Sequence, residues 1–175
     1  MIKIVSGIRR CGKSYLLSEL FTQHLLDEGV DRHHIIHIDL DTRDNLEYRN
    51  PEACNQYVKS LIKDDNMYYL LLDEVQLMED FVSVLNGFLH IKNLDVYVTG
   101  SNSKFLSSDI ITEVRGRGGE IRVYPFSFAE FYSVIGGDKW DAWSKYIRYG
   151  GMPHTLNIQT AKEKEAYLKG LFNQV

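Results

Sequence analysis

The sequence predicts an α/β fold of three layers, in which a parallel five-stranded sheet is covered by helices on both faces. Two observations predict it. Short β-branched apolar runs alternate with longer amphipathic runs up to Pro125, and strands separated by helices of that length form right-handed parallel βαβ units. From Pro125 onward only helical patterns follow. We therefore expect a core over residues 1–125 and a helical segment over residues 126–175.

Five short apolar runs predict the strands of that sheet. Short apolar runs bounded by turn residues are typical of buried strands, and the first run is also β-branched. The third run is the most apolar and ends in two carboxylates. The predicted strands cover residues 2–6, 34–39, 68–73, 94–99 and 120–124.

Helical periodicity occupies the intervals between the strands. In the first helix, five apolar side chains share one face, and Gly29 provides a stop. Pro51 stands at a first-turn position of the second helix, where proline is tolerated. The apolar face of the first helix contains Leu16, Leu17, Leu20, Phe21 and Leu25. The predicted helices cover residues 13–28, 51–63, 79–91, 127–135, 138–149 and 160–173.

The composition fits a chain with one sizeable packed core. Of 175 residues, 44% are apolar and 25% charged, which is ordinary for globular proteins. No apolar run approaches the roughly 18 residues of a membrane span, and the opening residues lack a signal-peptide pattern. Two cysteines cannot form a disulfide framework or a zinc site, so we expect a cytoplasmic protein without membrane contact. A net charge of −4 and a pI near 5.9 disfavour a broad nucleic-acid-binding face.

A phosphate-binding loop joins the first predicted strand to the first helix. Residues 7–14 match the pattern G-x-x-x-x-G-K-[ST] in the strand–loop–helix context that the motif requires. Glycines let backbone N–H groups surround a phosphate at a helix start. Lys13 then reaches the β- and γ-phosphates, and the Ser14 hydroxyl ligates Mg²⁺. The predicted nucleotide-binding residues are Gly7, Ile8, Arg9, Arg10, Cys11, Gly12, Lys13 and Ser14.

Three side chains of this loop have two interpretations each. Cys11 could be a reactive thiol near a helix start, although a small residue tolerated in a tight loop is the favoured interpretation. Arg9 and Arg10 either reach phosphates or face solvent. The residue types alone do not decide between these two interpretations of the arginines.

Two carboxylates end the third predicted strand. At the carboxyl end of a central strand beside a phosphate loop, Asp73 would orient Mg²⁺ or its waters. Glu74 would then polarise an attacking water as general base. A strand that leaves into solvent would also carry acids, but the phosphate loop favours the metal-side interpretation.

Polar residues after the fourth strand form a second candidate group. Asn102 or Ser101 would face the attacking water, or would cap a helix after a glycine turn. Arg115 and Arg117, which are flanked by glycines, either present a cation to a neighbouring subunit's γ-phosphate or form a solvated basic loop.

Three histidines crowd the second predicted strand. Zinc requires three or four convergent ligands, and no cysteine or acid spacing supports such a site here. We therefore interpret the group as surface and strand residues. It consists of His33, His34 and His37.

Several stretches together resemble the prokaryotic AAA-type ATPases of the archaeal-ATPase-like group, a branch of the P-loop class with an additional strand and a catalytic glutamate. The resemblance covers about residues 2–155 and implies the sheet order 5-1-4-3-2 and Mg²⁺-dependent ATP hydrolysis. It implies that Asp73 serves the metal, Glu74 activates water and Asn102 acts as a polar sensor. Arg117 resembles the arginine of the family's Gly-Arg motif. The stretches are residues 7–14, 72–76, 98–102, 115–117, 124–131 and 149–153.

The chain also departs from that family. Family members usually have a short segment before the first strand and continue into a C-terminal domain of uncertain role. We therefore expect a truncated chain, whose nucleic-acid or protein partner would bind through the missing part. The turn at Gly150–Pro153 is then a hinge or nucleotide-state sensor, or else a bare helix-breaking turn.

The leading functional prediction is an ATPase that acts as a motor or switch. A GTPase is disfavoured because no Asn-Lys-x-Asp motif occurs, and residues 92–95 have the wrong order. A small-molecule kinase would not need Glu74 beside Asp73. A nucleotide-dependent binding and signalling module with negligible turnover remains an alternative. A homo-oligomer, with an arginine supplied in trans, is the expected assembly.

Overall fold

The computed structural model describes residues 1–100 and 118–173, and the chain divides into two compact units. The first unit, Met1–Ser6 with Lys13–Arg122, contains the sheet and its flanking helices. The second unit contains Gly7–Gly12 and Val123–Val175. The first part of the phosphate loop therefore groups with the helical residues.

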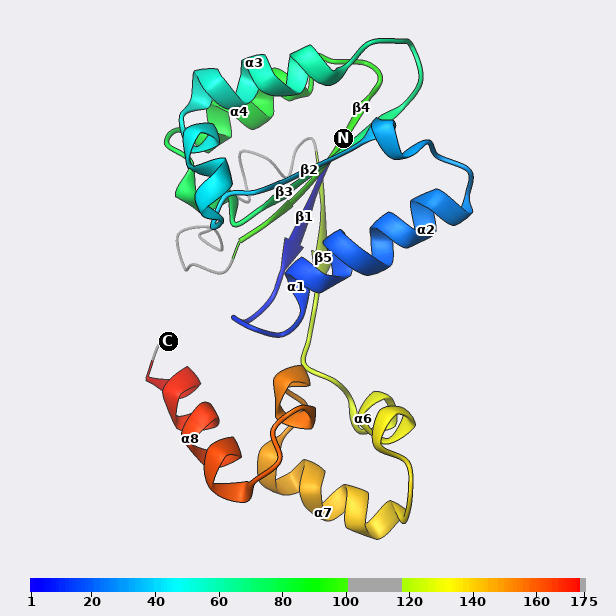
Figure 1. Ribbon diagram of the computed structural model, residues 1–175, viewed down its shortest axis with the longest axis vertical. Helices are drawn as coiled ribbons and strands as arrows, with labels where there is room; N and C mark the ends of the chain where they lie inside the picture. The colour runs from blue at the N-terminus through cyan, green and yellow to red at the C-terminus, as the bar shows by residue number, and fades with distance from the viewer. Residues whose placement is uncertain (101–117, 174–175) are drawn as a thin grey trace. The chain divides into compact units, whose positions relative to one another are not determined.

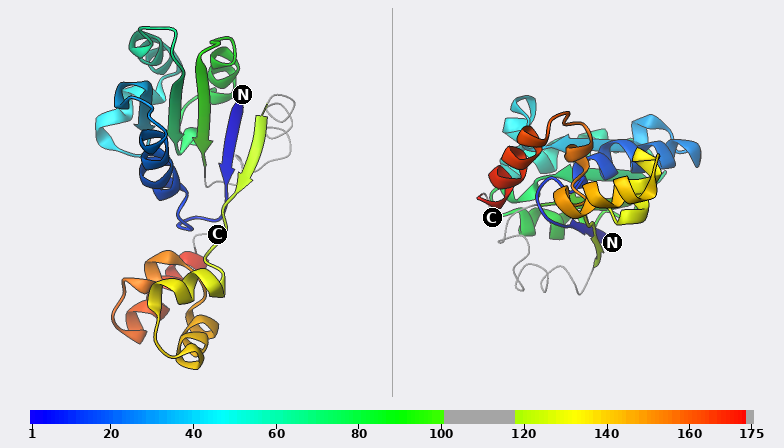
Figure 2. Two further views of the ribbon diagram at one scale, coloured as in Figure 1. Left: turned by 90° about the vertical axis from the view of Figure 1, so that its right-hand side faces the viewer. Right: turned by 90° about the horizontal axis from the view of Figure 1, so that it is seen from below.

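The sheet of the first unit is parallel in all four strand pairs. Its strands run in one direction, as Figure 2 shows. They are β1 (Ile2–Ser6), β2 (Ile35–Asp39), β3 (Tyr68–Asp73), β4 (Leu94–Thr99) and β5 (Gly118–Arg122). The strand order β2-β3-β4-β1-β5 confirms the order 5-1-4-3-2 that the family resemblance implies.

Strand β5 lies earlier in the sequence than its apolar content predicts. We expected residues 120–124, whereas the strand begins at Gly118 and ends at Arg122. Pairing with β1 sets these limits, because Ile2 is opposite Gly118 and Ser6 is opposite Arg122. At an edge strand the partner's register decides which residues complete the ladder, and glycines serve there as well as apolar residues.

Helices cover both faces of the sheet, as the sequence predicts (Figure 1). Helix α2 (Thr22–Asp27) contributes Leu25 to a cluster with Leu71 on one face. Helices α3 (Pro51–Leu61) and α4 (Phe81–Phe88) pack on the other face, against Leu70 and Leu72. Because successive strand residues point to opposite faces, the run from Leu70 to Leu72 is buried on both. Short 3₁₀ segments cover Arg32–His34, Arg43–Arg49 and Val75–Leu77.

The first predicted helix is interrupted by a π-helical segment. Helix α1 (Lys13–Tyr15) continues into a π-helix over Leu16–Phe21 before α2 begins. The backbone N–H and the hydroxyl of Thr22 both donate to the Leu17 carbonyl, five residues earlier, and the hydroxyl contact is 3.1 Å. The wider turn changes the facing of the side chains. Leu20 is consequently 54% exposed, although α-helical spacing places it on the buried face.

The second unit contains three helices after Val123. They are α6 (Phe128–Ile135), α7 (Lys139–Tyr149) and α8 (Ala161–Phe172), with a 3₁₀ turn over Pro153–Leu156. Each begins with a capping side chain, Ser127, Asp138 or Thr160, which accepts hydrogen bonds from the first-turn N–H groups. Aromatic contacts join α6 to α7, with the Phe128 and Trp143 ring centroids 4.8 Å apart.

A close backbone approach fixes the Gly-Gly turn after α7. The N–H of Phe126 donates to the Gly151 carbonyl at 2.8 Å, and the Tyr146 hydroxyl donates to the Phe126 carbonyl at 2.8 Å. A Cβ at Gly151 would overlap that same Phe126 carbonyl. Only glycine therefore fits at this position, which gives the turn at Gly150–Pro153 a packing role.

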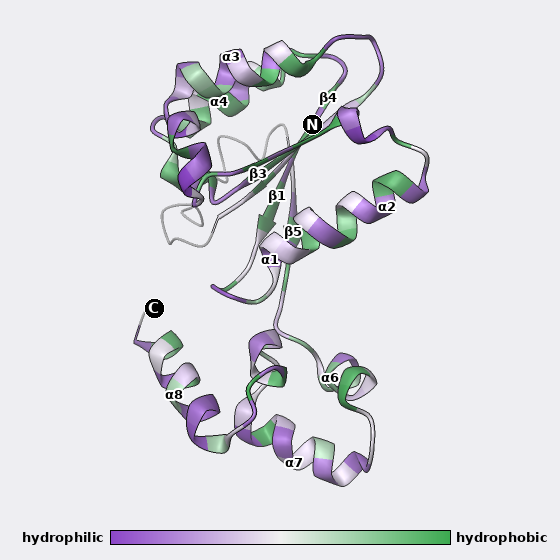
Figure 3. Ribbon diagram, in the orientation of Figure 1, coloured by the Kyte–Doolittle hydropathy of each residue, from purple (hydrophilic) through white to green (hydrophobic). Residues whose placement is uncertain are grey.

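The hydropathy of the helices differs from one helix to another. In Figure 3, apolar and polar residues alternate along α3 and α7, whereas α6 is mostly apolar. In the ranges that the structure describes, none of the helices combines the length and the apolar character needed to cross a bilayer.

Candidate functional site

Three neighbouring strands end at the same edge of the sheet. Strand β4 lies between β3 and β1, and because all three are parallel, their carboxyl ends meet there. Leu72 is paired with Val98, and Val5 with Thr99. This register brings the end of β3, with its carboxylates, beside the end of β4. In open α/β sheets this edge is where ligands bind.

A buried hydrogen-bond set joins the ends of β3 and β4. The Thr99 hydroxyl donates to Oδ1 of Asp73 and accepts the backbone N–H of Glu74 at 3.0 Å. Asp73 is 4% exposed and Thr99 is fully buried. A buried carboxylate needs hydrogen-bond donors to offset its lost hydration, and Thr99 supplies one while it fixes the carboxylate's direction.

The backbone of Glu74 adopts an uncommon left-handed conformation, with φ 54° and ψ 48°. The Thr99 hydrogen bond to its N–H contributes to holding this conformation, which few non-glycine residues adopt. The Gln76 amide nitrogen donates to Oε2 of Glu74. Among the described residues, Oε1 of Gln76 is buried without a hydrogen-bond partner. Glu74 is therefore oriented from its backbone and from its side chain.

Thr99 and Gln76 are functional candidates that the sequence analysis missed. Both belong to stretches that carry the family resemblance or adjoin it, yet neither received a role. For Thr99, the available signal was a polar residue at the last position of an apolar strand. For Gln76, it was a side-chain amide two residues after the carboxylate pair. Neither signal identifies its partner without the sheet register.

The lysine of the phosphate loop begins a helix of the first unit. Lys13 is the first residue of α1 and is 4% exposed, while Ser14 follows it on the exposed side. Charged lysines are rarely buried unless they have a function or a partner. The position at a helix start suits a residue that neutralises phosphate charge.

The loop itself has the backbone that phosphate cradles require. Gly7 has φ 148°, Gly12 has φ 107° and Arg10 has φ 63°, all outside the range that side chains ordinarily adopt. The space around a Cβ at Gly12 is open, whereas a Cβ at Gly7 would overlap the Val123 carbonyl. Gly12 is thus needed for its backbone angle and Gly7 also for a close approach.

Contacts within the second unit hold the loop. The Cys11 thiol is 3.6 Å from the Val123 carbonyl, to which it donates, and Cys11 is 4% exposed. This burial supports the interpretation of Cys11 as a small packing residue. The Arg10 guanidinium lies over the Tyr167 ring, 5.6 Å from its centroid, an arrangement that neither earlier interpretation of Arg10 includes.

Several candidate residues fall outside the ranges that the structure describes. Ser101, Asn102, Arg115 and Arg117 lie between residues 100 and 118, so their proposed roles stay predictions.

The histidines of the second strand region have acidic neighbours. His33 Nδ1 lies 2.8 Å from Asp31, and His34 Nε2 lies 3.1 Å from Asp64. Backbone and side-chain hydrogen bonds from His33 lower the pKa of Asp31, and hydrogen bonds from Asn66 and His34 lower that of Asp64. In residues 1–100 and 118–173 no group of three or more His, Cys, Asp or Glu side chains could hold a metal. A phosphate-loop Mg²⁺ needs no such group, because phosphates and waters complete its coordination.

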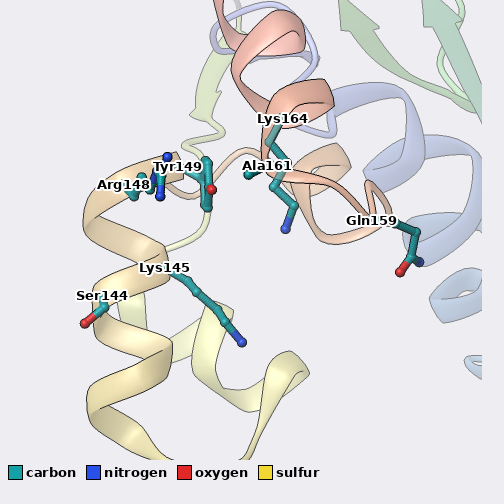
Figure 4. Close-up of a pocket in the computed structure, with 7 residues that line it drawn as sticks. All are labelled: Ser144, Lys145, Arg148, Tyr149, Gln159, Ala161 and Lys164. Carbon is teal, nitrogen blue, oxygen red and sulfur yellow. The ribbon is translucent and has the colours of Figure 1, made fainter.

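A separate hollow of about 340 Å³ lies between α7 and α8. Lys145 and Lys164 point into it from the two helices (Figure 4). Arg148 pairs with Glu165 at 2.7 Å, and both Arg148 and Lys164 lie over the Tyr149 ring. The Arg148–Glu165 and Lys164–Tyr149 contacts join α7 to α8, and none of the candidate nucleotide-site residues lines the hollow.

The strand order, the phosphate loop and the paired carboxylates define an AAA-type P-loop NTPase domain. A family model described as an AAA domain matches residues 1–132, and the chain belongs to this family. An uncharacterised protein of Haemophilus influenzae is 30% identical over 99% of this chain and 44% of its own length. One of Methanocaldococcus jannaschii is 28% identical over 98% of this chain and 41% of its own length. The chain thus spans less than half the length of these curated relatives.

Solved structures share the fold at low identity. Cdc6p from Pyrobaculum aerophilum is similar with a TM-score of 0.52, at 14% identity over 82% of this chain and 43% of that one. PCH-2 from C. elegans is similar with a TM-score of 0.53, at 15% identity over 84% of this chain and 40% of that one. These likenesses concern the arrangement of the elements.

Proposed function

We propose that this domain binds ATP with Mg²⁺ and hydrolyses it. The observation that carries the proposal is the hydrogen-bonded set of Asp73, Thr99 and Glu74 at the ends of two buried strands. Strand β1, which leads into the phosphate loop, is the next strand of the sheet. A loop that only binds nucleotide does not need a second carboxylate, whereas hydrolysis needs a group that accepts a proton from water.

Binding of the triphosphate is assigned to the loop and to the start of α1. Backbone N–H groups of Gly7–Gly12 and the ammonium of Lys13 neutralise phosphate oxygens. The Ser14 hydroxyl and the Asp73 carboxylate would hold Mg²⁺, which when bound neutralises charge on the β- and γ-phosphates. The fit of Asp73 to this role rests on its burial and on the Thr99 hydroxyl that fixes its Oδ1.

Hydrolysis is assigned to Glu74 as general base. The Thr99 and Gln76 hydrogen bonds orient its backbone and its Oε2, and an oriented base avoids the cost of ordering a flexible side chain at each turnover. Asn102 is the proposed sensor that contacts the attacking water or the γ-phosphate. The AAA-domain family match supports hydrolysis over a small-molecule kinase reaction.

Assembly is proposed to complete the site. Strand β5 is at the edge of the sheet, and β1 and β4 separate it from β3. Arg117 precedes β5 directly, so it is better placed for a neighbouring subunit's nucleotide than for its own. An arginine supplied in trans would neutralise the charge that develops on the transferred phosphoryl group.

The biological output is proposed to be a motor or a switch. A nucleic-acid or protein partner would bind through a part that corresponds to the region of the longer relatives outside the match. A nucleotide-dependent signalling module would carry the same loop, and it differs from a motor in turnover.

A turnover assay tests the proposal directly. Phosphate release from ATP and from GTP is measured with this chain, with and without DNA, and again after Mg²⁺ is removed with a chelator. We expect slow, Mg²⁺-dependent hydrolysis of ATP. Tight ATP binding without phosphate release under every condition would favour the signalling module, and the absence of ATP binding would reject the proposal.

A further inference from the structure

Arg10 occupies a backbone position in the phosphate loop that a side chain rarely adopts. Its φ of 63° is in the left-handed region, where an L-residue with a long side chain is destabilised relative to glycine. A conformation of this kind persists only where surrounding contacts hold it. The Arg10 side chain contacts the Tyr167 ring of α8.

Tyr167 meets Arg10 with its ring face. The guanidinium carbon lies 5.6 Å from the ring centroid, within the range of an attractive cation–π contact. The ring is half-buried, and among the described residues its hydroxyl is buried without a hydrogen-bond partner. A buried hydroxyl without a partner lowers stability, so the ring and not the hydroxyl accounts for a favourable contact here.

Further contacts connect Tyr167 to the Gly-Gly turn. The His154 ring centroid is 4.9 Å from that of Tyr167, and His154 belongs to the 3₁₀ turn over Pro153–Leu156. That turn follows Gly151, whose backbone is bonded to Phe126. A continuous set of contacts therefore runs from the fixed turn through α8 to the phosphate loop, all within one compact unit.

We propose that Tyr167 is a positioning residue for the phosphate loop. Its ring holds the Arg10 guanidinium and so keeps the loop in the conformation that receives the triphosphate. Without the ring the loop samples other conformations. The nucleotide affinity then falls in proportion to the fraction of time that the loop spends in its binding conformation. By linkage, bound nucleotide stabilises the Tyr167 contact and with it the position of α8. The inference rests on the proposed ATP binding.

The test compares ATP affinity and turnover in four variants. Tyr167→Leu removes the ring, and we expect the Kd for Mg-ATP to rise about 5- to 30-fold, the range of a cation–π contact from exposed to desolvated. At saturating ATP its turnover stays near that of the parent, because Tyr167 acts on binding. Tyr167→Phe keeps the ring and restores affinity. In an Arg10→Ala background, Tyr167→Leu causes no further loss, because the two residues act through one contact.

A neighbouring residue provides the structural control. Leu168→Ala perturbs α8 next to Tyr167 and should lower thermal stability while the ATP affinity is kept. Parent-like affinity in Tyr167→Leu, or an equal loss in the Arg10→Ala background, would overturn the inference. A double-mutant cycle on thermal stability without nucleotide tests the Arg10–Tyr167 contact by itself, so it stays informative if the parent fails to bind ATP and the proposed function is rejected.

Discussion

The strand ends at Asp73 and the phosphate loop, to which we assign parts of one proposed function, are built in different ways. Asp73 and Thr99 stand at the ends of buried parallel strands, and hydrogen bonds between residues 26 positions apart fix them. The loop Gly7–Gly12 has irregular backbone with three positive φ values, and its side chains Cys11 and Arg10 contact Val123 and Tyr167 of the second unit. Sheet register holds the strand ends, whereas the contacts of the loop include Val123, which follows β5, and Tyr167 of α8.

This difference separates two kinds of function. The backbone of a register-locked strand cannot shift without breaking ladder hydrogen bonds, and the Thr99 hydroxyl fixes the Asp73 side chain on it, so this geometry suits the chemical step. A loop of irregular backbone outside the sheet can change conformation when a ligand arrives, which suits binding and signalling. A change at Glu74 should therefore lower turnover at constant affinity, and changes in the loop should lower affinity.

The prediction with the largest expected effect asks whether the strand ends and the loop of one chain are enough for ATP hydrolysis. If Arg117 acts in trans, activity per subunit rises with protein concentration, and Arg117→Ala abolishes that rise, a loss of about 10³-fold, while ATP still binds. Mixing Arg117→Ala with Lys13→Ala protein should restore activity, because each supplies what the other lacks. Phosphate release is the measurement. Concentration-independent turnover with no recovery in the mixture would leave Arg117 as a solvated loop residue.

The next effect concerns the strand ends. Glu74→Gln keeps the shape of the side chain and removes the proton acceptor, so turnover should fall by about 10²-fold or more while the Kd for ATP is unchanged. Calorimetry gives the affinity and phosphate release gives the rate. A variant that hydrolyses ATP at the parent rate would place water activation at Asp73 or Asn102.

The third effect concerns the phosphate loop. Lys13→Ala removes the ammonium that neutralises two phosphates, and ATP binding should weaken by about 2 kcal/mol or more. Calorimetry at equal Mg²⁺ concentration measures it, with the exposed Lys139→Ala as a control for lost surface charge. Equal affinity in parent and Lys13→Ala would contradict the assignment of the loop.

The smallest effect asks whether the strand ends owe their rigidity to Thr99. Thr99→Val keeps the volume but removes the hydroxyl that bonds Asp73 and Glu74, and the free energy of unfolding should fall by roughly 1.5 kcal/mol. Thr99→Ser retains the hydroxyl and should lose less than the valine variant. Chemical denaturation measures both. If the serine variant is the less stable of the two, packing and not hydrogen bonding explains the burial of Thr99.

Patterns local to the sequence predicted most of the elements. The strands β1, β3 and β4 have the predicted bounds, because a short apolar run between turn residues is a local property of a buried strand. The phosphate-loop motif and the carboxylates after Leu72 are likewise visible as consecutive residues. The strand order followed from the resemblance of several motifs to one family, not from periodicity.

Other features depended on pairings that no local pattern contains. The limits of β5 come from its register with β1, and the π-helical segment at Leu16–Phe21 comes from bonds to a carbonyl five residues back. The roles of Thr99 and Gln76 likewise require neighbours that the sheet brings together.

The sequence by itself determined the class of protein and the residues of the motif, because both are written in consecutive side chains. Only the tertiary structure decided that the phosphate loop contacts Val123 and Tyr167, residues more than a hundred positions away. The physical reason is that a contact between residues so far apart in the sequence depends on the path that the folded chain takes back to the loop. Val123 reaches the loop because β5 pairs with β1, with Ser6 opposite Arg122, and Tyr167 reaches it from α8. The loop sequence encodes neither return of the chain.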